Sequence, residues 1–414
     1  MKAIEVKRMS GFPVIILLVS MLFIQGCATM RPRNAVPLDF SGKVTIDGMP
    51  DIRTDINDPD PVVMQKSLID SFKEEGLVNL FGTKIYPVLA ISGGGANGAY
   101  GAGLLKGWSK EGSRPLFKII TGVSSGSIMA LYTFLGKDYD DQLEDFFTKM
   151  STKDVMRQRN LFSIIFGDSL FSSAPLAKKI STIVDGKLLA KVAEEHKRGR
   201  RLFVGTVNLD AQEFVVWDMG MLACKGGSDS VKMFRKILLA SCSLPMTFPP
   251  VHFKVISATG EIYDEMHVDG GTVRGVFYID RLTKNMEGAA KIFGIDPSKY
   301  RPQIYILSNA YMSPIRQQVK DSLVDISVRS LDTVVGAANN GDVYRLYADA
   351  KRRGLDFNLA YIPSDFKPNP KELFDPKEMQ RLFKRGYNDA INGYKWYKTP
   401  PGYAAEDGTS EKTE

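Results

Sequence analysis

From Tyr86 onward, short apolar runs alternate with stretches in which apolar positions recur every three or four residues. The short runs are typical of buried strands and the longer spacing is typical of helices packed on one face. Strands are predicted at 88–91, 116–121, 202–208, 213–217, 251–255 and 303–308, with a weaker last one at 355–363. Helices are predicted at 96–109, 125–135, 141–149, 175–197, 230–241, 316–331, 345–353 and 375–394. This alternation predicts an α/β fold with a mainly parallel central sheet covered by helices on both faces.

The N-terminus has the pattern of a secretion signal. Lys2, Lys7 and Arg8 precede an apolar run at 14–24 that is too short to span a bilayer comfortably. The run is followed by IQGCA at 24–28, which resembles the lipobox of bacterial lipoproteins, where cleavage leaves a lipid-modified cysteine. The resemblance implies a signal peptide at 1–26 and a mature protein held in the bacterial cell envelope by acyl chains on Cys27. A conventional cleavage site beside a free cysteine is the alternative.

The residue after Cys27 bears on the membrane that would hold the protein. Ala28 stands there rather than an aspartate, which resembles the outer-membrane sorting pattern. Residues 27–60 are rich in Pro and Asp and lack sustained periodicity, so they are predicted to form a tether and entry loop. One domain is predicted at 61–398, with its motifs at 86–309, followed by a polar tail at 399–414.

Composition and charge narrow the classes of partner. The chain is 44% hydrophobic and 24% charged, as in ordinary globular proteins. Its formal charge of +7 falls to +5 when the signal peptide, with three cations and one acid, is removed. This mild bias fits either an anionic lipid surface or a merely basic soluble surface. No dense Lys/Arg tract with interleaved aromatics is present, so no nucleic-acid partner is expected.

The cysteines and histidines do not form a metal-binding pattern. The three cysteines and three histidines are scattered, without CxxC or HExxH spacing, at Cys27, Cys224, Cys242, His196, His252 and His267. Neither a disulfide framework nor a zinc site follows from such spacing. We therefore expect chemistry that uses no metal and no cofactor.

The strongest chemical signal is the run GVSSG at 122–126, which lies between a predicted strand and a predicted helix. A serine on such a sharp strand-to-helix turn is pushed out of the edge of the sheet, and Gly122 and Gly126 allow the backbone to pack closely around it. The pattern predicts Ser124 as a nucleophile. A glycine-rich turn with an idle serine is the alternative.

A second glycine-rich run, SGGGANG at 92–98, follows the preceding predicted strand and so lies at the same edge of the sheet. The backbone N–H groups of Gly93, Gly94 and Gly95 can point at a developing oxyanion, aided by the helix that follows. The run also matches the GxGxxG dinucleotide fingerprint, which requires an acidic residue at the end of the next strand. Between the predicted helix and the end of that strand the only acidic residue is Glu111, which comes before the strand begins. This argues against a dinucleotide-binding oxidoreductase.

Together with ASCSLP at 240–245, FPP at 248–250 and VDGG at 268–271, these runs occur in the order found in patatin-like phospholipases, which the chain resembles over about 86–309. The resemblance implies a three-layer patatin-like fold and a catalytic dyad. In it Ser124 attacks an ester, Asp269 acts as base, and Gly93 to Gly95 bind the oxyanion. The chain departs from the family where Ala96 and Asn97 replace the usual cation of the glycine loop.

The position of the histidines leaves one question open. An α/β-hydrolase triad runs Ser, Asp, His along the chain, and no histidine follows Asp269. His267 lies two positions before Asp269 in a predicted strand, where the two side chains share a face. A triad based on His267 would take an earlier acid such as Asp210, Asp218 or Asp264. His267 therefore either contributes to catalysis or packs beside the site.

These patterns favour a serine hydrolase that acts on phospholipids, lysophospholipids or simpler acyl esters. Its partners would be membrane lipids, reached through lipidated Cys27. A lipid-binding lipoprotein of the same fold without turnover is the alternative.

An apolar, aromatic stretch at 161–171 is either ordinary packing or an acyl-chain wall or lid.

Overall fold

The computed structural model describes residues 33–58, 62–74, 84–160, 162, 167–278 and 300–403. The predicted signal peptide, Cys27 and Ala28, most of the aromatic stretch at 161–166, and the tail beyond residue 403 lie outside these ranges.

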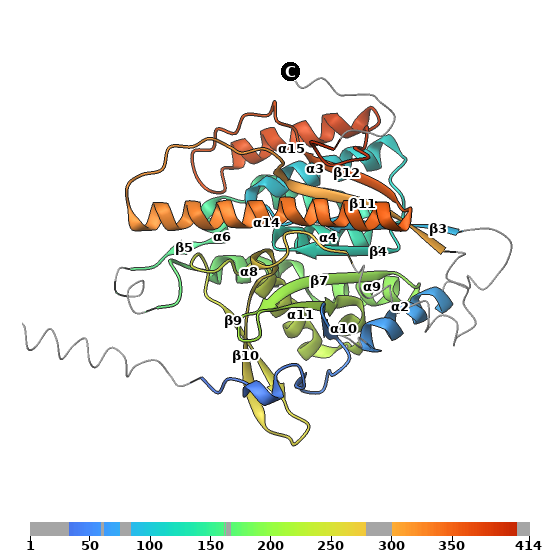
Figure 1. Cartoon of the computed structure of the whole chain (residues 1–414), viewed down its shortest axis with the longest axis vertical. Coiled ribbons are helices and arrows are strands. Elements are labelled where there is room, and N and C mark those ends of the chain that lie inside the picture. The colour runs from blue at the N-terminus through green and yellow to red at the C-terminus, as the bar shows by residue number, and fades with distance from the viewer. Residues whose placement is uncertain are drawn as a thin grey trace, which may run out of the picture.

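A mixed sheet with a parallel central part forms the centre of the molecule (Figure 1). Within the described residues it has ten strands, and its main path runs β1-β9-β10-β7-β4-β3-β11-β12, with β8 and β2 joined beside β7. The strands β7, β4, β3, β11 and β12 are parallel, whereas β10, β9, β1, β8 and β2 pair antiparallel. The strands are β1 Thr45–Ile46, β2 Arg53–Asp55, β3 Lys84–Ile91, β4 Ile119–Val123, β7 Arg201–Asn208, β8 Glu213–Asp218, β9 Val251–Ile256, β10 Ile262–Asp269, β11 Tyr300–Tyr311 and β12 Asp356–Ile362.

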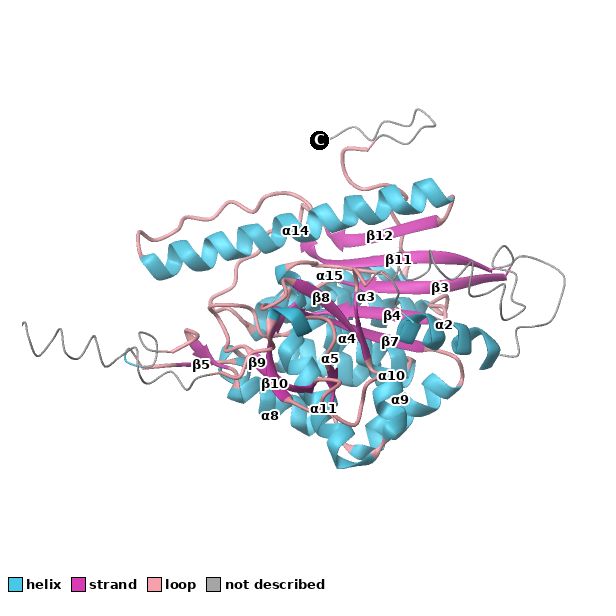
Figure 2. Cartoon of the chain, turned by 60° about the horizontal axis from the view of Figure 1, so that its bottom comes forward, coloured by secondary structure: helices cyan, strands magenta, loops and turns pink. Residues whose placement is uncertain are grey.

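Helices cover both faces of this sheet (Figure 2). They are α2 Val62–Glu74, α3 Gly98–Glu111, α4 Ser125–Leu135, α5 Asp140–Lys149, α6 Thr152–Val155, α8 Ala174–Ile183, α9 Gly186–Lys197, α10 Met219–Lys225, α11 Gly227–Ser241, α14 Leu323–Arg353 and α15 Pro376–Ile391. Four 3-10 turns, η1 Leu38–Phe40, η2 Gly95–Asn97, η3 Lys137–Tyr139 and η4 Gly270–Thr272, and a small second sheet of β5 Arg157–Gln158 and β6 Phe171–Ser172 complete the described elements.

The hydrophobic core of the described residues lies on both sides of the sheet. Leu89 and Ile91 of β3 face one cluster, which includes residues of α3, α4, α5 and α15. Val88 and Ala90 face the other, under α2 and α14. Because successive strand side chains point to opposite faces, a strand buried on both sides is a continuous apolar run. This three-layer arrangement confirms the predicted fold class.

Several predicted elements differ from the observed ones. The helix predicted at 175–197 is two helices, because Asp185 caps α9 by accepting the Leu188 N–H at 2.8 Å. The helices predicted at 316–331 and 345–353 correspond to the single 31-residue α14, which begins at Leu323, so residues 316–322 are not helical. Burial of Val343 and Leu346 against the sheet holds the intervening glycine- and asparagine-containing stretch in the helix. The helices α2 and α10 were not predicted.

Part of the segment predicted as a tether packs against the domain. Strand β1 pairs with β9 and β2 pairs with β8, and Ile46, Ile52 and Ile56 are buried. Arg33 forms an ion pair with Asp210. Strands of two or three residues are too short to produce a recognisable alternation, so the sequence pattern does not reveal them. Over the described ranges, no helix has the length and apolar character needed to cross a bilayer.

Candidate active site

Ser124 lies on the tight turn between β4 and α4, as the sequence predicts. Its φ of 55° and ψ of −134° place a non-glycine residue in a sparsely populated backbone region. The turn is closely packed: a Cβ added to Gly126 would lie 2.4 Å from the Ser92 carbonyl oxygen, and one added to Gly122 would lie 2.4 Å from the Gly126 carbonyl oxygen. The glycines therefore allow β4, α4 and the end of β3 to meet at the half-buried Ser124.

Neighbouring serines hold the backbone of Ser124 in this conformation. Its N–H donates to Ser241 Oγ at 3.0 Å, and that hydroxyl donates to the Gly205 carbonyl at 2.8 Å. Its carbonyl accepts from the Ser127 N–H at 2.9 Å and from Ser127 Oγ at 2.6 Å. The strained turn is thus fixed from both sides.

Strand register brings Asp269 to Ser124. Val123 pairs with Gly205 across β4 and β7, and Asp269 pairs with Thr206 across β7 and β10. The Asp269 N–H donates to the Ser243 carbonyl at 2.9 Å, and Asp269 Oδ1 accepts the Gly271 N–H at 2.8 Å. The last residue of β10 therefore lies two strands from the nucleophile turn, at the same edge of the sheet.

The Asp269 carboxyl group is buried, with 3% of the residue exposed. Burial raises its pKa from 3.8 to about 7, while hydrogen bonds from the Ser124 hydroxyl and the Gly271 N–H act in the opposite direction. The effect of the Ser124 hydroxyl on this pKa places the two predicted dyad residues next to each other. A carboxylate with a raised pKa is a stronger base toward a hydroxyl than an ordinary aspartate.

The glycine loop after β3 lies directly beside the serine. A Cβ on Gly93 would lie 2.9 Å from Ser124 Cβ, so a larger residue would displace the nucleophile. The Gly93 N–H donates to the Gly275 carbonyl at 3.2 Å and is therefore engaged. Among the described residues, no hydrogen bond uses the N–H of Gly94 or Gly95. Of the three predicted oxyanion donors, these two are available to a ligand.

Asn309, at the end of β11, supports the glycine loop and was not identified from the sequence. Its N–H donates to Ser92 Oγ at 2.8 Å, its Nδ2 donates to the Ser92 carbonyl at 3.0 Å, and both residues are fully buried. A Cβ on Gly94, whose φ is 153°, would lie 2.3 Å from the Asn309 carbonyl oxygen. The sequence feature that could have indicated Asn309 is a polar residue at the carboxyl end of an apolar parallel strand.

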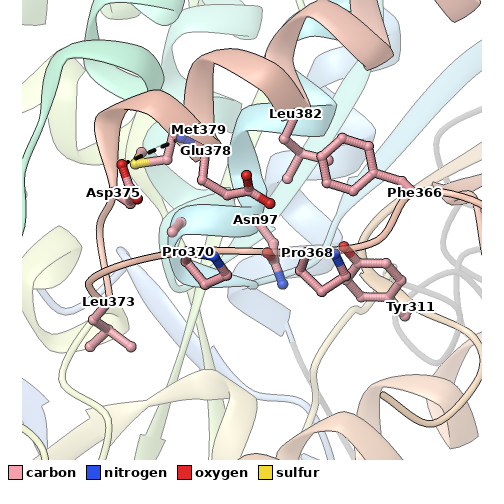
Figure 3. Close-up of a pocket in the computed structure, with 11 residues that line it drawn as sticks. Asn97, Tyr311, Phe366, Pro368, Pro370, Leu373, Asp375, Glu378, Met379 and Leu382 are labelled. Carbon is pink, nitrogen blue, oxygen red and sulfur yellow. Dashed lines mark hydrogen bonds between the residues drawn. The ribbon is translucent and has the colours of Figure 1, made fainter. Parts of the chain in front are cut away.

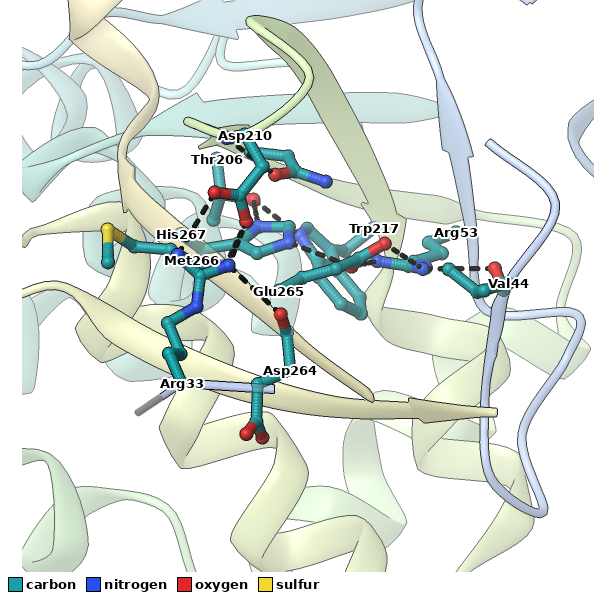
Figure 4. A network of polar contacts seen from close by, with 11 residues as sticks. Arg33, Val44, Arg53, Thr206, Asp210, Trp217, Asp264, Glu265, Met266 and His267 are labelled. Atoms are coloured by element: carbon teal, nitrogen blue, oxygen red, sulfur yellow. Dashed lines mark hydrogen bonds and ion pairs between the residues drawn. The ribbon is translucent and has the colours of Figure 1, made fainter. Parts of the chain in front are cut away.

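His267 belongs to a separate polar network (Figure 4). Its Nδ1 lies 2.9 Å from Thr206 Oγ1 and its Nε2 lies 3.2 Å from Glu265 Oε2. Burial lowers the pKa of its ring, which packs against Trp217 and Phe253. Since both ring nitrogens have partners other than Ser124 and Asp269, the geometry favours packing beside the site over a catalytic role.

A small cavity opens beside the glycine loop (Figure 3). Ala96 and Asn97 form one wall, and the segment from Phe366 to Leu382, with Tyr311, forms the rest. Neither Ser124 nor Asp269 lines it. The glycine loop nevertheless links the two places, because a Cβ on Gly95 would lie 3.8 Å from the Phe374 ring.

Across the part of the chain that the structure describes, no group of three or more His, Cys, Asp or Glu side chains is placed to hold a metal ion. Cys242 is buried beside Asp269, and burial raises the pKa of its thiol well above the ordinary value. It is therefore a packing residue and not a second nucleophile.

One protein-family model and one solved structure resemble parts of this chain. Residues 89–279 match the family model described as patatin-like phospholipase. A crystal structure of VipD from Legionella pneumophila is similar at 12% sequence identity with a TM-score of 0.34, covering 75% of this chain and 66% of that one. No curated protein sequence matches the chain. The match covers 191 of the 414 residues, and this central part of the chain is similar to the patatin-like phospholipases.

Proposed function

We propose that the protein hydrolyses carboxylic esters of lipids through a Ser124–Asp269 dyad. The observation that carries the proposal is the buried Asp269 carboxyl group, whose pKa is lowered by the hydroxyl of a serine on a strained strand-to-helix turn. The family match supports a lipid acyl hydrolase.

In the first half-reaction Ser124 Oγ attacks the ester carbonyl carbon while Asp269 accepts the hydroxyl proton. The carbonyl oxygen becomes an oxyanion, which the N–H groups of Gly94 and Gly95 stabilise. The bond to the alcohol then breaks, Asp269 returns the proton to the departing alcohol oxygen, and the acyl group remains on Ser124.

In the second half-reaction Asp269 takes a proton from water, which attacks the acyl-enzyme. Collapse of the second tetrahedral intermediate releases the fatty acid, and Asp269 gives its proton back to Ser124 Oγ. The burial that raises the pKa of Asp269 to about 7 suits both directions of transfer, because the group gives and takes protons near neutral pH.

Phospholipids, lysophospholipids and simpler acyl esters are the proposed substrate class. We also propose that the mature protein is anchored in the bacterial cell envelope through acyl chains on Cys27, in the outer membrane rather than the inner one. The sequence IQGCA at 24–28 supports this anchor.

Labelling with a fluorescent fluorophosphonate, followed by hydrolysis of short-chain esters, tests the proposal. The wild type is expected to label and turn over, Ser124→Ala to lose both, and Asp269→Asn to lose hydrolysis. Ser125→Ala, at the adjacent serine, is the matched control and should retain labelling. A folded wild type that neither labels nor hydrolyses but binds lipid would instead establish the non-catalytic lipid-binding alternative.

A further inference from the structure

The first half of α14 has an unusual surface. Of its described residues from Leu323 to Ala338, none is buried. In Figures 1 and 2 this half extends past the strands β11 and β12 that the second half covers. A helix in water with many apolar residues normally buries one face. In this half even the inward residues are only partly buried, so its exposed apolar residues require an explanation.

The outward face of this helix half carries no charge. At 100° per residue, one stripe passes through positions opposite the face that Val343 and Leu346 bury. We call it the exposed stripe, and it consists of Leu323, Ile326, Ser330, Val334, Ala337 and Gly341. Leu323 is 81% exposed, Val334 62% and Ile326 46%. The charged residues of this half, Asp325, Arg329 and Asp332, lie off the stripe.

The same helix contacts the candidate active site. A Cβ on Gly271 would lie 3.6 Å from Val335 Cγ1, and Gly271 is the residue whose N–H binds Asp269. Four residues after Gly271, the Gly275 N–H donates to Oδ2 of Asp342, which also lies on α14, at 2.8 Å. The exposed stripe thus lies on the outer side of a helix whose inner side covers the turn after Asp269.

Other exposed apolar residues lie near the same turn. Val273, 42% exposed, is four residues after Asp269. Met246, 43% exposed, is three residues after Ser243, whose carbonyl binds the Asp269 N–H. Exposed apolar residues therefore occur both on the exposed stripe and close in sequence to the residues that hold Asp269.

From these observations we propose that the exposed stripe docks on the surface of a lipid bilayer and holds the active site against it. The inference rests on the proposed function, because a lipid ester supplies the reason for docking. The segment before the helix suits a membrane surface: Arg316 and Lys320 are exposed there with one acid, Asp321. Cations of this kind contact lipid phosphates while adjacent apolar side chains enter the acyl region.

The area of the stripe argues against a second copy of the chain as the occupant. The exposed fractions of Leu323, Ile326 and Val334 together equal about two whole side chains, or roughly 150 to 250 Å² of apolar surface. A stable dimer buries roughly 800 Å² on each partner. Insertion into a bilayer has no such minimum, because each apolar side chain contributes by itself.

Sedimentation with vesicles of phosphatidylethanolamine and phosphatidylglycerol tests the docking surface. The chain from residue 28 onward is used so that acyl chains on Cys27 do not contribute. The triple variant Leu323→Gln, Ile326→Gln and Val334→Gln keeps helix-forming residues but removes the apolar surface. Its vesicle affinity is expected to fall about a hundredfold, given two side chains' worth of lost burial. Turnover of a dissolved short-chain ester should be unchanged.

A second triple variant, Val62→Gln, Leu116→Gln and Ile262→Gln, is the matched control, since these residues are similarly exposed but lie off the stripe. It should bind vesicles like the wild type. Equal vesicle affinity of the stripe variant and the wild type would overturn the proposal, as would a wild-type dimer that the stripe substitutions convert to a monomer. Absence of fluorophosphonate labelling in the wild type would instead refute the proposed function, and vesicle binding would still report on the stripe.

Discussion

Replacing Asp269 by asparagine should stabilise the folded protein while abolishing its activity. The pKa of Asp269 is about 7 in the folded chain and 3.8 ordinarily, because the carboxyl group is buried. A folded-state pKa above the unfolded value means that the native chain binds the proton more tightly. The resulting stabilisation is complete below about pH 4 and is lost as the pH rises through 7.

The size of this effect follows from the two pKa values. Their difference of about three corresponds to about 4 kcal/mol, because each pKa unit is worth about 1.4 kcal/mol. Asparagine keeps the size of the side chain and an oxygen that accepts the Gly271 N–H, but it carries no charge. We therefore expect the gain in the free energy of unfolding over the wild type to grow by about 3 kcal/mol between pH 5 and pH 9, toward a total of about 4 kcal/mol.

Urea unfolding of both proteins across this pH range measures the difference. Asp138→Asn, at an exposed aspartate of η3, is the control and should show no gain that grows with pH. If the advantage of Asp269→Asn over the wild type were the same at pH 5 and pH 9, the burial argument and the base assigned to Asp269 would both be wrong.

Three further predictions concern the same site. The kcat/KM for a short-chain ester should rise with pH and level off above an inflection near 7, because Asp269 must be ionised to accept the Ser124 proton; a rate that is flat from pH 5 to 9 would contradict this. Gly126→Ala should lower the free energy of unfolding by about 3 kcal/mol in denaturant titrations, since its Cβ would lie 2.4 Å from the Ser92 carbonyl oxygen. Gly186→Ala, where the added Cβ meets open space, is its control. Asn309→Ala should reduce kcat about tenfold with little change in KM, because the loop bearing Gly94 and Gly95 loses its support; an unchanged kcat would show that Asn309 has no positioning role.

The sequence predicts those parts of the site that are local. The strand, turn and helix around Ser124 lie within about fifteen residues, and α4 was predicted with its observed bounds, Ser125–Leu135. The proximity of Asp269 to Ser124 is not local, because it depends on the register between β4, β7 and β10. Only the family resemblance indicated it in advance.

Contacts between distant segments explain the residues that sequence analysis did not identify. Asn309 and Ser241 act through hydrogen bonds to Ser92 and Ser124, which are far from them in the chain. The Gly93 N–H is engaged by Gly275, a contact that no spacing rule predicts. Similarly, buried side chains in its second half keep α14 continuous, whereas the local sequence pattern predicted two separate helices.

The turn after α11 gives the site a particular mechanical character. Ser241 accepts a hydrogen bond from the backbone N–H of Ser124, and the Ser243 carbonyl accepts one from that of Asp269, so one short segment holds both residues of the proposed dyad. The oxyanion donors depend on a different support, Ser92 and Asn309, across the sheet. Two separate sets of hydrogen bonds therefore hold the proposed dyad and the proposed oxyanion donors. Because Ser92 and Gly93 pack against the Ser124 turn, the two supports are coupled, and the energetic effects of substitutions at Ser241 and Asn309 should depart from simple addition.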